Sequence, residues 1–253
     1  MKFLEMQQGS IQWLQARSGL ITASCFADAI STVGGLDDRQ QKYVDFVRAG
    51  IPEKEALAQA GYKAAPTSET VKRALRGELT IEASDTAKRY AADLAFERIN
   101  GAPFQEPHKA WILERGHEME AMARMHYEAR TQAFVTESGL CVDDDGVFAY
   151  SSDGLVDDDG LIEIKAPIDS LKIMAMWRTG DVSEYIHQMQ GGMWLTGRKW
   201  CDFIMYAPML ANAGKDLFVK RIMRDDEFID RMVLELRRFE MMVEENVRVI
   251  TTK

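Results

Sequence analysis

The chain has 253 residues, of which 46% are hydrophobic and 28% charged, a balance typical of a folded globular protein. It contains no apolar run near the ~20 residues that cross a bilayer and no signal-peptide core, so we expect a soluble cytoplasmic protein without a membrane partner. Three widely spaced cysteines indicate neither a disulfide framework nor a structural zinc site. The net charge of −9 argues against a nucleic-acid partner, although carboxylates that bind a metal ion add negative charge that the ion neutralises.

Hydrophobic spacing, caps and turn residues predict the order of the elements. Helices are expected over residues 10–17, 22–30, 38–48, 52–60, 68–76, 85–99 and 110–130. Strands follow over 135–142, 147–151 and 161–165, then a helix over 184–196, strands over 202–206 and 217–222, and a closing helix over 225–248. This order predicts an α/β (α+β) fold in which helices flank a mixed sheet.

Residues 37–78 differ from their surroundings in charge. They hold 8 Lys/Arg against 7 Asp/Glu, a net charge of +1, whereas the rest of the chain holds 23 against 33, a net charge of −10. Three short helical patterns follow one another there. We therefore expect a small helical domain over 37–78, inserted into a larger domain made of residues 1–36 and 79–253.

Three residues on neighbouring segments carry the main chemical signal. Alternation along the strand puts Glu163 and Lys165 on one face and turns Ile164 into the core. Asp153 precedes Glu163 across a turn, and adjacent strands lie ~4.8 Å apart, so the two carboxylates can share Mg²⁺ with the Ile164 carbonyl. Lys165 would orient an attacking water, help to deprotonate it, or offset charge on a phosphate. On spacing alone, an exposed Asp turn and an ordinary Glu/Lys strand face are the more common interpretation.

A glycine inside a predicted helix draws attention to one more carboxylate. Gly116 costs its helix ~1 kcal/mol relative to Ala, so we expect another group to approach closely there. Glu120, one turn further on, is a candidate third carboxylate. Glu114 and Glu118 are alternatives, and either is equally well explained as a solvated side chain.

Two further pairs of residues suggest a water site and a phosphate site. Tyr185 and Gln188 share a helix face by their spacing, so Gln188 can reach the attacking water or the Lys165 amine. Arg17 ends one helix and Ser24 opens the next, and an arginine beside a helix N-terminus suits a phosphate. Taken singly, these are ordinary surface residues and caps.

In order and spacing, these pieces resemble the phage lambda exonuclease and YqaJ-like viral recombinase family, within the restriction-endonuclease-like PD-(D/E)xK nucleases. The resemblance covers about residues 1–36 and 81–250 and leaves out the insertion. The matching segments are Trp13-Leu14-x-x-Arg17-x-Gly19-x-Ile21-Thr22-Ala23-Ser24, Gly116-x-x-x-Glu120, Ser151-x-Asp153-Gly154, Glu163-x-Lys165 and Tyr185-x-x-Gln188-x-Gln190-x-x-Met193-Trp194.

The resemblance implies a restriction-endonuclease-like core and a Mg²⁺-dependent exonuclease, with Mn²⁺ able to substitute. It implies 5′-to-3′ digestion of linear double-stranded DNA to leave 3′ overhangs for phage-type recombination. It also implies a homotrimer, a single-strand annealing protein as partner, and the cytoplasm of a bacterial host. The alternatives are a related nuclease of other polarity or endonuclease activity, and a non-catalytic DNA-binding or packaging module.

The resemblance also implies a role for each matching residue. Asp153 and Glu163 would bind metal, with the Ile164 carbonyl, and Glu120 would serve a second metal ion. Lys165 and Gln188 would position the nucleophilic water. The substrate contacts would come from Arg17, Ser24 and Ser151, which hold a 5′ phosphate, and from Tyr185.

The chain departs from the family pattern in three places. Ser152 stands where the motif has proline, and no basic residue follows Ser24 until Arg39, which puts a second 5′-phosphate contact in doubt. The insertion is an addition. Its Tyr43-x-x-Phe46 and Ala56-x-x-x-Ala60-Gly61-Tyr62 patterns resemble the helix-turn-helix units of phage terminase small subunits, so it is an extra DNA-binding module, a spacer or a docking surface for a partner.

Overall fold

The protein is described by a computed structural model that covers residues 1–78, 80–104 and 110–252, without the side chains of 110–115 and 117. The chain forms two compact units, Met1–Ala29 with Tyr90–Lys253, and Ile30–Arg89. The smaller unit spans more residues than the helical segment 37–78 because it also includes the two strands of one ladder, which come before and after the helices in the sequence. Within the described ranges, no helix is both long and apolar enough to cross a bilayer.

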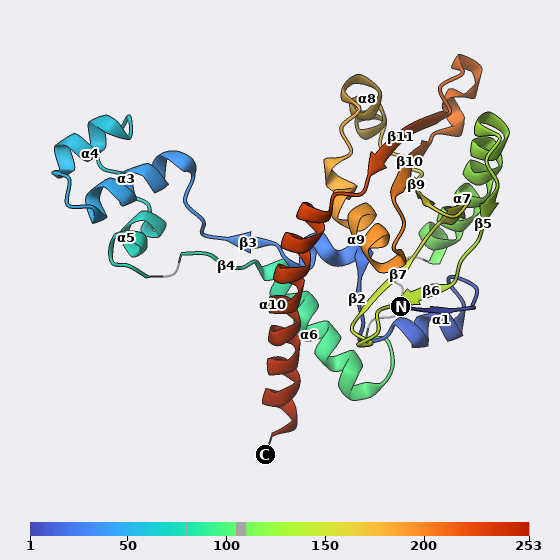
Figure 1. Ribbon diagram of the computed structural model, residues 1–253, viewed down its shortest axis with the longest axis horizontal. Helices are drawn as coiled ribbons and strands as arrows, with labels where there is room; N and C mark the ends of the chain where they lie inside the picture. Colours follow the sequence, from blue (N-terminus) through green and yellow to red (C-terminus); the bar gives the residue numbers. More distant parts are fainter. Residues whose placement is uncertain (79, 105–109, 253) are drawn as a thin grey trace. The chain divides into compact units, whose positions relative to one another are not determined.

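Besides the first residues of α6 (Asp85–Asn100), the described part of the smaller unit consists of three helices and one ladder (Figure 1). These are β3 (Thr32–Val33), α3 (Asp38–Arg48), α4 (Glu53–Gln59), α5 (Glu69–Leu75) and β4 (Glu82–Ala83), with β3 and β4 antiparallel. Asp37 caps α3 in a capping box with Gln40, and Ser68 caps α5. Tyr43, Val44 and Val71 are buried with three alanines in a core of their own. The three predicted helices are confirmed.

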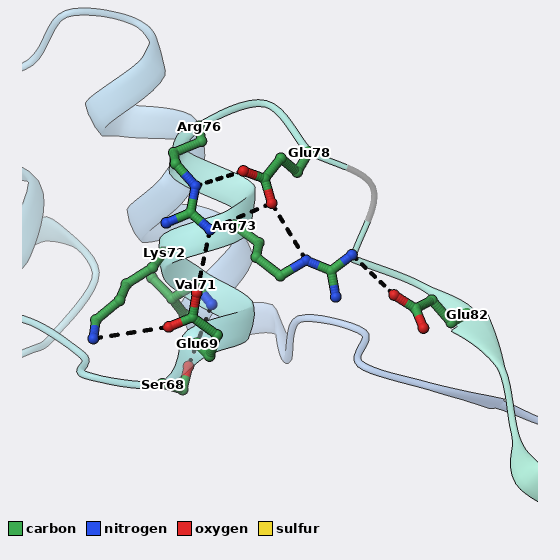
Figure 2. A network of polar contacts seen from close by, with 8 residues as sticks. All are labelled: Ser68, Glu69, Val71, Lys72, Arg73, Arg76, Glu78 and Glu82. Carbon is green, nitrogen blue, oxygen red and sulfur yellow. Dashed lines mark hydrogen bonds and ion pairs between the residues drawn. The ribbon is translucent and has the colours of Figure 1, made fainter.

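The cations of α5 are paired with carboxylates of the same unit (Figure 2). Arg73 Nη2 lies 2.9 Å from Glu82, and Arg76 Nε donates to Glu78 at 2.5 Å. Lys72 Nζ lies 3.9 Å from Glu69. A DNA phosphate would have to displace these carboxylates, so α5 offers weak electrostatic attraction to DNA.

Two sheets form the centre of the larger unit, and both are mixed. The five-stranded sheet has the order β11-β10-β9-β8-β5, with β9 and β10 parallel and the other pairs antiparallel. The four-stranded sheet has the order β1-β6-β7-β2, with β2 and β7 parallel. The strands are β1 (Lys2–Leu4), β2 (Ile21–Thr22), β5 (Val135–Thr136), β6 (Leu140–Val142), β7 (Phe148–Ser151), β8 (Gly154–Val156), β9 (Gly160–Lys165), β10 (Trp200–Tyr206) and β11 (Leu217–Met223).

Helices α7 and α9 lie on opposite sides of β9 and β10 (Figure 1). On the α7 side, Ala123 and Tyr127 pack against Ile162 and Ile164. The mixed α/β fold is therefore as predicted. The helical elements are α1 (Ile11–Arg17), η1 (Ala23–Cys25), α2 (Phe26–Ala29), α6 (Asp85–Asn100), α7 (Ala110–Thr131), α8 (Ser170–Thr179), η2 (Ser183–Tyr185), α9 (Ile186–Thr196), η3 (Pro208–Ala213) and α10 (Asp226–Thr251).

The structure corrects three sequence-based expectations. The single strand predicted over 135–142 is two strands in different sheets, β5 and β6. They separate at Gly139, where a Cβ would lie 1.9 Å from the Leu4 carbonyl oxygen of β1. The helix predicted over 22–30 is a 3₁₀ turn followed by one α-helical turn. Helix α8 was not predicted, although Asp169 caps it and Gly180, at φ 62°, ends it.

The smaller unit is expected to be removable without unfolding the larger one. Val33 and Glu82 are directly paired in the β3–β4 ladder, so a two-residue Asn-Gly turn can replace residues 34–81. Of the removed residues that the structure describes, none belongs to the core around Ile162 or to the core around Leu140. The shortened chain should unfold in one cooperative thermal transition by calorimetry and circular dichroism. A broad, non-cooperative melt would contradict this independence.

Candidate active site

The residues predicted to form the catalytic centre converge where the two sheets meet. Asp153 lies between β7 and β8, and Glu163 and Lys165 lie near the end of β9. The antiparallel register Gly154↔Ile162 brings Asp153 beside β9. There the Ile164 N–H donates to Asp153 Oδ2 at 2.6 Å. The geometry thus joins the first carboxylate directly to the strand that carries the second.

Glu163 is held on both of its oxygens although only 1% of it is exposed. The Tyr150 hydroxyl donates to Oε2 at 3.3 Å, and Lys165 Nζ forms an ion pair with Oε1 at 2.7 Å. Although this ion pair is close, Oε1 accepts no hydrogen bond from the residues described. Lys165 Nζ also donates to Gln188 Oε1 at 3.3 Å and lies 5.6 Å from the centre of the Tyr185 ring. The structure therefore gathers the predicted catalytic residues of β9 and α9.

Burial and mutual repulsion alter the acidity of this group. Burial raises the pKa of Asp153 well above its usual range, and the charges of Glu163 and Glu120 raise it further, against the opposing effect of Lys165. Burial alone would lower the pKa of Lys165, but Glu163 and Asp153 raise it above its ordinary value. The pKa of Tyr150 is raised by burial and by Glu163, which keeps its hydroxyl a donor. Lys165 is consequently a protonated amine between two acids.

The donor set fits a Mg²⁺ ion that keeps most of its waters. No cluster of three or more His, Cys, Asp or Glu side chains suited to a metal occurs in the described part of the chain. Asp153 and Glu163 are two buried carboxylates, and Mg²⁺ typically uses one or two together with water and phosphate oxygens. Glu163 Oε1 accepts no hydrogen bond from the described residues, and the raised pKa of Asp153 shows that its negative charge is poorly compensated. A divalent cation would offset the charge of both carboxylates. Glu120 and the Ile164 carbonyl as ligands stay predictions.

A cavity of about 600 Å³ opens onto Asp153 and Glu120. Its wall includes Glu120, Arg124, Ser152 and Asp153, together with the chain around β1. Glu120 lies one helical turn before Arg124 on α7, so both side chains reach this cavity from one face. Small solutes can therefore reach Asp153 and Glu120 from this side, whereas Glu163 is buried behind them.

A second polar cluster joins the N-terminal helices to β7. Trp13 Nε1 donates to Ser151 Oγ at 2.7 Å, and the Arg17 guanidinium lies 4.4 Å over the Trp13 ring. Arg17 Nη2 donates to Thr22 Oγ1 at 3.2 Å, and Thr22 Oγ1 lies 3.3 Å from Ser24 Oγ. The predicted phosphate residues are thus brought together. Trp13 and Thr22 were not predicted to link them.

One motif residue, Gln190, has a structural role instead, and so does the nearby Gly192. Gln190 donates to the Met223 carbonyl at 2.9 Å and accepts from the Asp225 N–H at 3.0 Å, so it fastens α9 to the start of α10. A Cβ on Gly192 would lie 2.6 Å from the Tyr150 ring, which needs this bare helix surface to reach Glu163.

The close approach expected at Gly116 is not found among the described residues. The nearest atom to a Cβ there would be Glu120 Oε1, at 3.9 Å. Of the alternatives to Glu120, Glu118 is exposed and the Glu114 side chain lies outside the described residues.

Replacing one buried acid should stabilise the metal-free protein. Ionised Asp153 destabilises the fold because its pKa is raised, and this penalty grows as the pH rises from about 4 through the raised pKa. Metal-free Asp153→Asn should therefore melt above the wild type at neutral pH, with the difference vanishing below about pH 4. Mg²⁺ should stabilise only the wild type.

The matched control for that measurement is Asp202→Asn. Asp202 is equally buried but accepts hydrogen bonds from Tyr127 at 2.7 Å and from Arg221 at 2.8 Å. This change should lower the melting temperature, because it removes a carboxylate with favourable partners. A lowered melting temperature in both variants would contradict the repulsion at Asp153.

Comparison with known proteins places this geometry in a family. Residues 12–199 match the model of the YqaJ-like viral recombinase domain. Two crystal structures of the alkaline exonuclease LHK-Exo from Laribacter hongkongensis, one of them in complex with dAMP, share 30% identity with the chain, with TM-scores of 0.67 and 0.68. Each match covers 95% of this chain and 96% of that one.

A phage-related exonuclease from Haemophilus somnus 129PT has the same fold at 15% identity, with a TM-score of 0.59 over 92% of this chain and 96% of that one. No curated protein sequence matches. The chain belongs to the YqaJ-like viral recombinase domain family.

Proposed function

We propose that the chain is a Mg²⁺-dependent exonuclease that degrades linear double-stranded DNA from its 5′ ends and leaves 3′ overhangs for recombination by single-strand annealing. That it is a deoxyribonuclease follows from its family and its likeness to alkaline exonucleases. The observation that carries the finer proposal is the spacing of two clusters. Ser151, which is held by the Arg17 cluster, lies two residues before Asp153.

The catalytic half of the proposal assigns a role to each side chain at the carboxylate centre. Asp153 and Glu163 would hold Mg²⁺, or Mn²⁺ in its place, with Glu120 near a second ion. When bound, the ion would supply a Lewis acid that activates water and offsets charge on the scissile phosphate. Because its pKa is raised, Lys165 would act as a cation and a hydrogen-bond donor to phosphate or water, and not as the base. Gln188 would fix the direction of the Lys165 amine.

The end-binding half of the proposal rests on the cluster around Arg17. The guanidinium offers several donors in a fixed plane, which suits a terminal phosphate. Thr22 links the Arg17 guanidinium to the Ser24 hydroxyl, and Trp13 links it to the Ser151 hydroxyl. A 5′ phosphate bound there would present the first phosphodiester to the carboxylates, and the Tyr185 ring would contact the substrate. This arrangement supports cleavage that depends on a DNA end.

The proposal includes an assembly and a setting. By its family, the protein would act as a homotrimer with a single-strand annealing protein, in the cytoplasm of a bacterial host of phage or prophage DNA. The alternatives are a nuclease of other polarity, an endonuclease, and a DNA-binding or packaging module. The last is disfavoured by the complete set of Asp153, Glu163 and Lys165 and by the paired cations of α5.

Removing the first carboxylate should abolish digestion. Asp153→Ala takes away one of the two proposed metal-binding carboxylates while leaving the Ile164 strand in place. With end-labelled linear duplex, the wild type should release nucleotides with Mg²⁺ and not with EDTA, and the variant should release none. Circular dichroism checks that it is folded. Full activity in the variant would overturn the assignment, and cutting of closed circles would favour an endonuclease.

Removing Arg17 should erase the preference for phosphorylated ends. The wild type is expected to digest a 5′-phosphorylated duplex faster than a 5′-hydroxyl duplex, because the guanidinium binds the added charge. Arg17→Ala should lower the rate on the phosphorylated duplex to that on the other. Arg238→Ala, at an exposed arginine of α10, is the control and should keep the preference. An unchanged rate ratio in Arg17→Ala would refute this phosphate site.

A further inference from the structure

Asp153 sits at the point where the chain crosses from one sheet to the other. Strand β7 of the four-stranded sheet ends at Ser151, and β8 of the five-stranded sheet begins at Gly154. The two residues between them, Ser152 and Asp153, belong to neither strand. Ladder hydrogen bonds therefore do not fix the backbone that aims the Asp153 carboxylate, and side chains must do so.

The first of these side chains is Ser152 itself. Its hydroxyl donates to the Gly154 carbonyl at 2.7 Å and accepts from the Gly154 N–H at 2.9 Å, so it closes a small ring around Asp153. Ser152 is only 3% exposed, which shields both bonds from water. The motif of the family places proline here, a residue whose own ring restricts the backbone. In this chain two hydrogen bonds replace that covalent restriction.

The second side chain is Arg124, which reaches the same turn from α7. Arg124 Nη1 donates to the Asp153 carbonyl oxygen at 3.0 Å, and Nη2 donates to Glu137 at 2.6 Å. Its side chain is 18% exposed. The helix is anchored beside it, because Ala123 and Tyr127 are buried against β9 and β10. Arg124 therefore links the Asp153 backbone to the helix that carries Glu120.

We propose that Arg124 and Ser152 are positioning residues that together hold the Asp153 turn in the geometry the cation requires. This inference rests on the proposed function and deepens it. Neither residue would contact substrate. Ser152 holds the turn by its two hydrogen bonds to Gly154, and Arg124 ties the turn to α7. Because Glu120 lies on the same helix as Arg124, this contact also fixes the distance between Asp153 and Glu120.

We call Arg124 and Ser152, with their contacts to the Asp153 turn, the clamp. Five variants test it: Arg124→Met, Arg124→Lys, Ser152→Ala, Ser152→Pro and Glu137→Gln. Arg124→Met keeps an unbranched, though shorter, side chain and removes both the charge and the donors, and Arg124→Lys keeps the charge and one donor nitrogen. Glu137→Gln is the matched control, because it weakens the other contact of Arg124 without touching Asp153. Binding of Mn²⁺ to the DNA-free protein is measured from the electron paramagnetic resonance signal of the free ion. KM and kcat on linear duplex and thermal unfolding in EDTA are measured alongside.

The clamp predicts a specific pattern across these variants. Arg124→Met and Ser152→Ala should weaken Mn²⁺ binding and lower kcat by about 10- to 100-fold, as is usual when a group that orients a metal ligand is removed. KM for DNA should stay unchanged, because the end-binding cluster is untouched. Arg124→Lys should recover part of the loss, and Ser152→Pro should bind Mn²⁺ more tightly than Ser152→Ala. Glu137→Gln should resemble the wild type.

Wild-type Mn²⁺ affinity in both Arg124→Met and Ser152→Ala would overturn the clamp. So would weakened binding in Glu137→Gln equal to that in Arg124→Met, which would mean general disturbance of the cavity. If Arg124→Met or Ser152→Ala unfolds in EDTA, Arg124→Lys decides instead: Mn²⁺ affinity below that of the wild type supports the clamp, and wild-type affinity overturns it. A wild type that binds Mn²⁺ but digests no DNA would refute the proposed function, and the binding comparison would still decide the clamp.

Discussion

Two buried carboxylates within reach of one another are the constraint around which the larger unit is arranged. Burial of Asp153 and Glu163 is unfavourable, because each loses water and repels the other. The fold compensates only in part, with the Lys165 ammonium and the Ile164 N–H. A stable core without a function would place apolar side chains there. In the proposed function, a cation and a DNA phosphate that share the site would offset this charge.

The junction of the two sheets joins the Arg17 cluster, the proposed site for a DNA end, to the carboxylate centre. Ser151, the last residue of β7, accepts from Trp13 and so belongs to the Arg17 cluster. Asp153 lies two residues further on, beside β9. Because only Ser152 and Asp153 separate β7 from β8, the distance between the two clusters is nearly fixed. An enzyme that cleaves at a set distance from a DNA end requires such a fixed distance.

The acidic net charge is compatible with DNA because the attraction is local. A net charge of −9 disfavours non-specific adhesion to a polyanion, and the cations of α5 are paired within their own unit. Arg17 and Lys165, the second of which is itself paired with Glu163, lie at the two clusters that would meet the end and the first phosphodiester in the proposed function. Such a distribution favours capture of a DNA end over coating of the duplex.

The sequence by itself determined the features that depend on near neighbours. The alternation along β9, most helix bounds and the ordered motifs with Asp153, Glu163 and Lys165 follow from local spacing, and the motifs indicated the family. Only the tertiary structure decided which sheet each strand joins and which residues support the site. Trp13 meets Ser151 across 138 positions, and Arg124 meets Asp153 across 29. Such contacts depend on strand register and on the packing of α7, which no local pattern encodes.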